Sequence, residues 1–192
     1  MTALPDRIDL EDGTHLRFFV VDDAEAVARA VAENLEHLRP WMPWADAQSA
    51  EPAFQRDRLR KLPALAERGE EWQYGLFAPD DSVLGSFGLM TRRGPGTMEI
   101  GYWIRADAEG RGLATRASAA LTDVALGLDG IRRVFICCDE ENVRSAAIPR
   151  RLGYRLLRTD TRAPEAPGER GRLMMWVRDR ADGGGRASSR MP

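Results

Sequence analysis

The chain is poor in histidine and cysteine, and its 192 residues contain a single lysine, Lys61. His15 and His37 are far in sequence from Cys137 and Cys138, so no spacing typical of a metal site occurs. Neighbouring residues of a strand point to opposite faces, so the two cysteines are expected to be buried thiols and not a disulfide. We therefore expect no metal and no disulfide framework.

Long apolar runs are missing as well. No run approaches the ~18 residues that a membrane-spanning helix needs, and the first residues lack the charged-then-apolar pattern of a secretion signal. These absences predict a cytoplasmic protein with no membrane partner. The formal net charge of −2 argues against nucleic acid as a partner. The positive residues are nearly all arginine, which a coding bias explains better than a role in anion recognition.

The length and the hydrophobic fraction of 43% suit one domain with a substantial core. We expect this domain over residues 8–178, followed over 179–192 by a polar, glycine-rich tail that is disordered. Hydrophobic periodicity predicts seven strands and four helices. In chain order they are a strand at 14–19, helices ending near 34 and 66, strands at 71–78, 83–90 and 97–104, a helix at 114–128, a strand at 133–138, a helix at 143–152, and strands at 154–158 and 173–177.

The stretch from Thr97 to Arg116 reads as a strand, a glycine turn and the start of a long helix. Glycines let the backbone of the turn, Gly110 to Thr115, come close to a ligand. The first amides of the helix lack partners within it, and the helix dipole adds partial positive charge at that end. Arg111 contributes a full charge. We interpret the turn as a cradle for a pyrophosphate.

Two common phosphate-binding patterns do not fit the turn. The Gly-x-x-x-x-Gly-Lys-Ser/Thr loop of nucleotide-binding proteins is absent. A dinucleotide fingerprint starts well at Gly110 and Gly112, but Thr115 stands where its third glycine belongs, and Asp129 precedes the next strand instead of following one. A glycine turn that merely caps a helix would look the same, so the rest of the chain must decide.

The run Glu109-Gly-Arg-Gly-Leu-Ala114 resembles motif A of the GNAT superfamily of N-acetyltransferases, Gln/Arg-x-x-Gly-x-Gly/Ala, with Glu109 in place of the usual Gln or Arg. The resemblance implies that acetyl-coenzyme A is the co-substrate, and that main-chain groups near Trp103 and Ile104 hold the pantetheine and polarise the thioester. The residues implied for the phosphate arm are Gly110, Arg111, Gly112, Leu113, Ala114 and Thr115.

The run from Asp139 to Tyr154 resembles motif B of the same superfamily, Asn-x-x-Ser/Ala followed by Leu-Gly-Phe/Tyr. Asn142 stands at the helix N-cap, where it satisfies an orphan amide, contacts coenzyme A, or does both. Many members carry, at the position of Pro149, a tyrosine that protonates the departing thiolate. The resemblance implies this role for Ser145 instead, with a plain surface serine as the alternative. Pro149 also frees the carbonyl of Ser145 as an acceptor.

The segment from Asn34 to Trp44 contains two tryptophans and two prolines and predicts a stiff apolar loop, either as core filling or as one wall of an acceptor groove. It resembles the Asn-x-x-x-Leu-x-x-Trp-Leu-Pro-Trp segment of the ribosomal-protein-serine/alanine N-acetyltransferase branch. The resemblance implies the GNAT fold, an α/β fold with a mixed, mostly antiparallel sheet of about seven strands and about four flanking helices.

The family transfers the acetyl group by direct attack of an amine. By hypothesis Glu99 is the base, acting through a water, and a paired or solvated carboxylate is the alternative. A protein α-amine is already partly neutral, whereas a lysine must lose about three pKa units, about 4 kcal/mol. A protein N-terminus is therefore the expected acceptor. The alternatives are a small-molecule amine, such as an antibiotic, and a silent coenzyme A-binding module. Whether the protein forms a homodimer is left open. Arg172 stands near a position where relatives often carry aspartate, so the acceptor side of the site is expected to differ from theirs.

Overall fold

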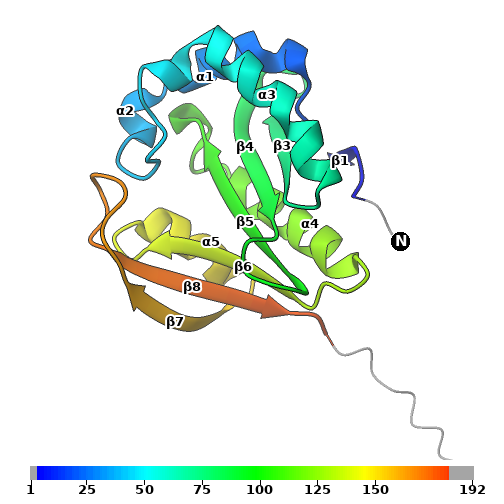
Figure 1. Cartoon of the computed structure of the whole chain (residues 1–192), viewed down its shortest axis with the longest axis vertical. Coiled ribbons are helices and arrows are strands. Elements are labelled where there is room, and N and C mark those ends of the chain that lie inside the picture. The colour runs from blue at the N-terminus through cyan, green and yellow to red at the C-terminus, as the bar shows by residue number, and fades with distance from the viewer. Residues whose placement is uncertain (1–3, 182–192) are drawn as a thin grey trace, which may run out of the picture.

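The computed structural model describes residues 4–181. Its centre is an eight-stranded sheet in the order β1-β2-β3-β4-β5-β6-β8-β7 (Figure 1). Neighbouring strands are antiparallel, except for the parallel pair β5 and β6. The strands are β1 Arg7–Asp9, β2 His15–Phe18, β3 Glu71–Phe77, β4 Val83–Met90, β5 Thr97–Ile104, β6 Arg133–Asp139, β7 Arg155–Thr161 and β8 Arg172–Asp179. The α-helices are α1 Ala24–Ala32, α2 Leu35–Leu38, α3 Pro52–Glu67, α4 Leu113–Gly127 and α5 Val143–Arg151.

The predicted fold class and element order are confirmed, with two additions. The edge strand β1 pairs with β2 from Arg7 opposite Arg17 to Asp9 opposite His15, and its three residues are too few to show an alternating pattern. The second addition is α2, a single helical turn inside the segment expected to be a loop.

The sequence favours an N-cap near Ser49 for the second predicted helix, with a bend or an early end at Pro63, but the helix begins later. Glu51 takes the N-cap position of α3 and Pro52 its first turn, where proline is well tolerated because the amide there needs no helical partner. Ser49 instead closes a separate turn, with its amide donating to Asp46 Oδ1 at 2.8 Å. Pro63 does not end the helix, which continues to Glu67.

Strand β8 extends one residue past the expected domain boundary at residue 178. Asp179 is the last residue of β8, and its carboxylate pairs with Arg133 and Arg155 at 2.8 and 3.1 Å. The side chain of Arg180 donates to the carbonyls of Leu126 and Leu128 at 2.6 and 2.7 Å. The remainder of the expected tail, residues 182–192, lies outside the described residues.

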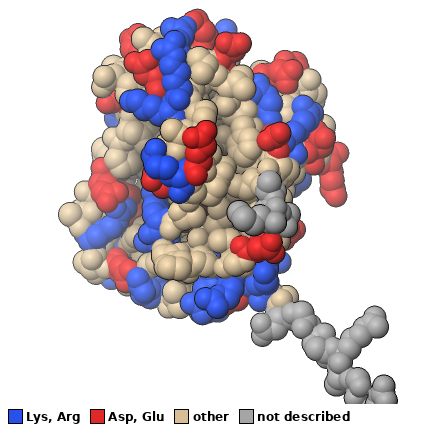
Figure 2. Space-filling view, turned by 45° about the vertical axis from the view of Figure 1, so that its right-hand side comes forward, with Lys and Arg blue, Asp and Glu red and all other residues tan. Residues whose placement is uncertain are grey.

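Acidic and basic side chains are interspersed over the face of the molecule that Figure 2 shows.

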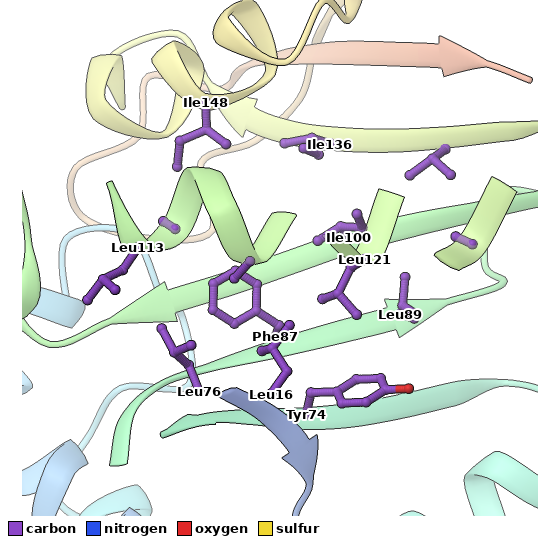
Figure 3. Close-up of a cluster of buried hydrophobic side chains, with 14 of the residues drawn as sticks. Leu16, Tyr74, Leu76, Phe87, Leu89, Ile100, Leu113, Leu121, Ile136 and Ile148 are labelled. Atoms are coloured by element: carbon purple, nitrogen blue, oxygen red, sulfur yellow. The ribbon is translucent and has the colours of Figure 1, made fainter. Parts of the chain in front are cut away.

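Helices cover the two faces of the sheet with separate cores. On one face, Leu113 and Leu121 of α4 pack against Ile100 of β5 and Phe87 of β4 (Figure 3). On the other face, α1 and α3 pack over a core that includes Trp103 of β5. Alternate residues of β5 thus enter different cores, as the strand pattern predicts.

The strands β5 and β6 separate halfway along β5. They pair only from Thr97 opposite Arg133 to Ile100 opposite Ile136, and then diverge (Figure 1). Residues Gly101 to Ile104 keep β4 as their neighbour on the other side. Among residues 4–181, no other strand pairs with the main-chain groups of Gly101–Ile104 that would have continued the ladder to β6, so these groups can bind a ligand.

Candidate active site

Two cavities meet where β5 and β6 separate. The larger, of about 820 Å³, is lined by residues of α1, α3 and the strand face beneath them. The smaller, of about 310 Å³, is lined by residues of α2, α5 and the end of β5. The residues common to both are Trp41, Met42, Tyr102, Trp103, Asn142 and Ser145. Molecules bound in the two cavities would therefore adjoin at these shared residues.

Cross-strand register builds the floor of the larger cavity. Gln73, Gly88 and Gly101 are neighbours in one row across β3, β4 and β5. A Cβ on Gly88 would lie 2.6 Å from Gln73 Nε2, so the glycine makes room for the Gln73 amide. Ser86 Oγ donates to Gln73 Oε1 at 2.9 Å, and Gln73 Nε2 donates to Glu71 at 2.6 Å. The floor thus carries a continuous polar chain.

Glu99 lines the larger cavity on the same strand face, and only 2% of it is exposed. Each of its carboxylate oxygens accepts from an arginine, one from Arg92 and the other from Arg93. The buried negative charge is thereby compensated. Glu99 is a paired carboxylate in this state, so it can act as a base only by exchanging a guanidinium contact for water or the amine.

The glycine turn that was predicted to cradle a pyrophosphate has left-handed glycines directly before a helix. Gly110 and Gly112 have φ values of 73° and 75°, a left-handed region that favours glycine. Helix α4 begins immediately afterwards, at Leu113. Within residues 4–181, the amides from Gly110 to Thr115 have no hydrogen-bond acceptor. A row of free donors thus lies at a helix N-terminus.

The carboxylate of Glu109, which departs from the family pattern, is paired on the side of α5. It accepts from Arg144, and its Oε1 lies 3.6 Å from Nε2 of His37. The neighbouring guanidinium offsets the negative charge that this residue brings near the cradle. Arg111 is exposed beside the free amides, and Ala114 lines the smaller cavity.

Asn142 caps α5, as the motif predicts: its Oδ1 accepts from the amide of Ser145 at 3.1 Å. The Ser145 hydroxyl lies at the cavity junction, 3.0 Å from Oη of Tyr102. Tyr102 also donates to the main-chain carbonyl of Ser145 at 3.2 Å. The sequence motifs assign no role to Tyr102.

The segment from Asn34 to Trp44 forms part of the cavity walls. Trp41 and Met42 line both cavities, and the Trp44 ring lies 6.2 Å from that of Trp103. Asn34 fixes the wall to the end of β5, because its Oδ1 accepts from the amide of Ala106 at 2.8 Å. This anchoring role of Asn34 was not anticipated.

Asp139 holds the end of β6 against the start of β8. Its carboxylate accepts from the amides of Glu141, Gly171 and Arg172 at 3.1, 2.9 and 3.0 Å. Burial alone would raise the pKa of Asp139, but these main-chain donors lower it below its usual value. Arg172, near the position where relatives carry aspartate, pairs with Glu140 at 2.7 Å.

The Asp139→Asn substitution is expected to destabilise the protein at neutral pH by about 1–3 kcal/mol, because an amide nitrogen would face buried N–H donors. A depressed carboxyl pKa contributes stability above the unfolded value of about 4, and that stability is lost as pH falls through the folded value. The gap in melting temperature between wild type and variant should therefore shrink from pH 7 to pH 3. A gap that is constant over this range would contradict the assignment.

Among residues 4–181, no cluster of three or more His, Cys, Asp or Glu is arranged to hold a metal ion. No helix within the same range is both long and apolar enough to span a membrane.

Comparison with known proteins places this geometry in a family. Residues 14–155 match the family described as acetyltransferase (GNAT) domain. The chain is 29% identical over 135 residues to the [ribosomal protein uS5]-alanine N-acetyltransferase of Escherichia coli, covering 69% of this chain and 70% of that protein. The protein belongs to the GNAT acetyltransferase family. It is accordingly an acyltransferase that depends on acetyl-coenzyme A.

Solved structures share the fold. The ribosomal-protein-S5-alanine acetyltransferase of Vibrio fischeri aligns with a TM-score of 0.82 at 19% identity, over 92% of this chain and 97% of that one. The microcin C7 self-immunity acetyltransferase MccE, in complex with acetyl-CoA and AMP, aligns with a TM-score of 0.82 at 19% identity, over 91% and 97% of the two chains. At this identity the likeness concerns the fold alone.

Proposed function

We propose that the protein transfers the acetyl group of acetyl-coenzyme A to the α-amine at the N-terminus of a protein. A relative named as a [ribosomal protein uS5]-alanine N-acetyltransferase supports a protein as the acceptor. The observation that carries the proposal is the pair of cavities that share Tyr102, Trp103, Asn142 and Ser145. The smaller cavity borders the cradle side, and the larger one receives the amine. The reaction takes place where they join.

The residues around the smaller cavity suit the co-substrate. The free amides from Gly110 to Thr115, helped by Arg111, hold the pyrophosphate. Main-chain groups of Trp103 and Ile104, on the half of β5 that does not pair with β6, hold the pantetheine and polarise the thioester carbonyl. Asn142 fixes the start of α5 and so places Ser145, whose hydroxyl donates a hydrogen bond to the departing sulfur.

The amine attacks the thioester directly. Burial raises the pKa of the Cys137 thiol to about 12 and that of Cys138 to about 11. Both are protonated near neutral pH, so neither is an activated nucleophile for an acyl-enzyme. Glu99 accepts the amine proton through a water, after one guanidinium contact opens.

A small-molecule amine that carries an anionic group is the second candidate acceptor. Arg58 lines the larger cavity, and its Nη1 donates to the neutral Oε1 of Gln55 at 3.2 Å. Burial lowers the pKa of Arg58, partly offset by Glu71. Among the described residues no carboxylate pairs with this guanidinium, so an acceptor anion could do so.

An acceptor panel with thiol release as the readout separates the possibilities. Peptides with a free N-terminal serine or alanine should turn over at least about tenfold faster than the same peptides blocked at the N-terminus with one internal lysine. Highest turnover with small anionic amines would replace the proposal by the second candidate. Binding of acetyl-coenzyme A by calorimetry without turnover of any amine would indicate a silent module. Cytoplasmic location and a homodimer stay predictions.

A further inference from the structure

The contact between Tyr102 and Ser145 bridges the two elements that border the gap. Tyr102 belongs to the half of β5 that does not pair with β6, and Ser145 belongs to the first turn of α5. Tyr102 Oη lies 3.0 Å from Ser145 Oγ and 3.2 Å from the Ser145 carbonyl oxygen. Both side chains line both cavities, so the pair lies where the thioester must be cleaved.

The Ser145 carbonyl is available to Tyr102 because of Pro149. In a regular helix, the amide four residues later would donate to this carbonyl, but Pro149, inside α5, has no N–H. A tyrosine hydroxyl has one hydrogen and can donate to only one acceptor at a time in this geometry. The Tyr102 hydrogen can therefore go to the carbonyl or to Ser145 Oγ.

The acceptor that Tyr102 chooses determines where the Ser145 hydroxyl can direct its own hydrogen. When Tyr102 donates to the carbonyl, Ser145 can donate its own hydrogen to Tyr102 Oη. When Tyr102 donates to Ser145 Oγ, the hydrogen of Ser145 is free to point into the junction. Only the second arrangement presents a donor to a developing negative charge.

We propose that Tyr102 is a positioning residue for acetyl transfer, which turns the Ser145 hydroxyl hydrogen toward the departing sulfur. The proposal rests on the role of Ser145 given under the proposed function. The bond from the amine nitrogen to the acetyl carbon forms, the carbon–sulfur bond breaks, and its electron pair goes to sulfur. Ser145 donates a hydrogen bond to that sulfur while Tyr102 donates to Ser145 Oγ, so the two bonds reinforce each other. The amine proton leaves through the base, and sulfur takes a proton from solvent.

The surroundings keep Tyr102 a donor. Burial raises its pKa, and the hydrogen bond to Ser145 lowers it only in part, so the hydroxyl stays protonated near neutral pH. Cys138 of β6 also contacts the Ser145 hydroxyl. It is a neutral thiol at this pH, and thiol sulfur is a weak acceptor, so it competes poorly for the Ser145 hydrogen.

A double-mutant cycle tests the proposal. Tyr102→Phe keeps the ring that lies 5.5 Å from the Phe87 ring and removes only the hydroxyl. It should lower kcat about tenfold, with KM for acetyl-coenzyme A and for the acceptor changed less than about twofold. In the Ser145→Ala enzyme, the same substitution should change kcat less than about twofold, because the group through which Tyr102 acts is gone.

Tyr154→Phe is the matched control. Tyr154 is buried, and its Oη lies 2.6 Å from Thr122 Oγ1, but it lines neither cavity. Its loss should lower the melting temperature and leave kcat unchanged. Wild-type kcat in Tyr102→Phe would overturn the positioning role. An equal fold loss of kcat from Tyr102→Phe in the wild-type and Ser145→Ala enzymes would overturn it too. The proposed function would still stand if Ser145→Ala alone is slow. Wild-type kcat in Ser145→Ala itself would remove the role of Ser145, and that of Tyr102 with it.

Discussion

Replacing Glu99 by glutamine is expected to lower kcat/KM at neutral pH about 100-fold, the size typical of a lost general base. The substitution keeps the shape of a side chain that is buried at the cavity wall. It removes the carboxylate that we propose as the acceptor of the amine proton. Because the ammonium form of an acceptor cannot attack, the variant should regain rate as pH rises toward the pKa of the amine. Initial rates from pH 6 to pH 9.5 measure this.

Glu99→Gln would also lower kcat/KM if Glu99 had only a structural role. A control variant must therefore test its ion pairs with Arg92 and Arg93 separately. If Glu99 merely anchors the arginines, then Arg93→Ala, which breaks the same contact, should be about as slow as Glu99→Gln. If Glu99 is the base, Arg93→Ala should keep most of the activity, because one carboxylate oxygen becomes free. An acceptor amine with a pKa well below neutral should rescue Glu99→Gln selectively, and failure of that rescue would remove the base role.

Much of the fold is predictable because β5 alternates so regularly. Ile100 enters the core under α4 and Trp103 the core under α1 and α3, as a period of two requires. The glycine turn and the cap at Asn142 are equally local features, set by φ and by orphan amides. These elements place the cradle and the start of α5 without reference to distant contacts.

The features that escaped prediction depend on contacts between distant segments. Asn34 meets the amide of Ala106, and Tyr102 meets Ser145, and no local periodicity encodes such meetings. A paired Glu99 was one of the stated alternatives, but its partners, Arg92 and Arg93, are set by how the β4–β5 turn folds back over the strand. Pro149 was the available signal for Tyr102, because a carbonyl left free by proline needs a donor.

Gly112→Val is expected to weaken the binding of acetyl-coenzyme A about 30-fold while leaving the fold intact. Gly112 has a φ of 75°, and a left-handed conformation costs an L-residue about 2 kcal/mol, roughly 30-fold in affinity. A Cβ there would also lie 2.9 Å from Nη1 of Arg116. Since the turn is exposed, the free variant relaxes out of this conformation, and ligand binding must restore it. Calorimetry should show the weaker Kd, with kcat at saturation nearly unchanged.

Gly127→Ala is the matched control for the cradle, because Gly127 is the last residue of the same helix and has open space where the alanine methyl would lie. It should bind acetyl-coenzyme A as wild type does, with equal or higher stability, since alanine favours helix over glycine. An unchanged Kd in Gly112→Val would show that the amides after Gly110 are not where the pyrophosphate binds. The half of β5 that does not pair with β6 would then have to hold acetyl-coenzyme A without these amides. The glycine turn would serve only to begin α4.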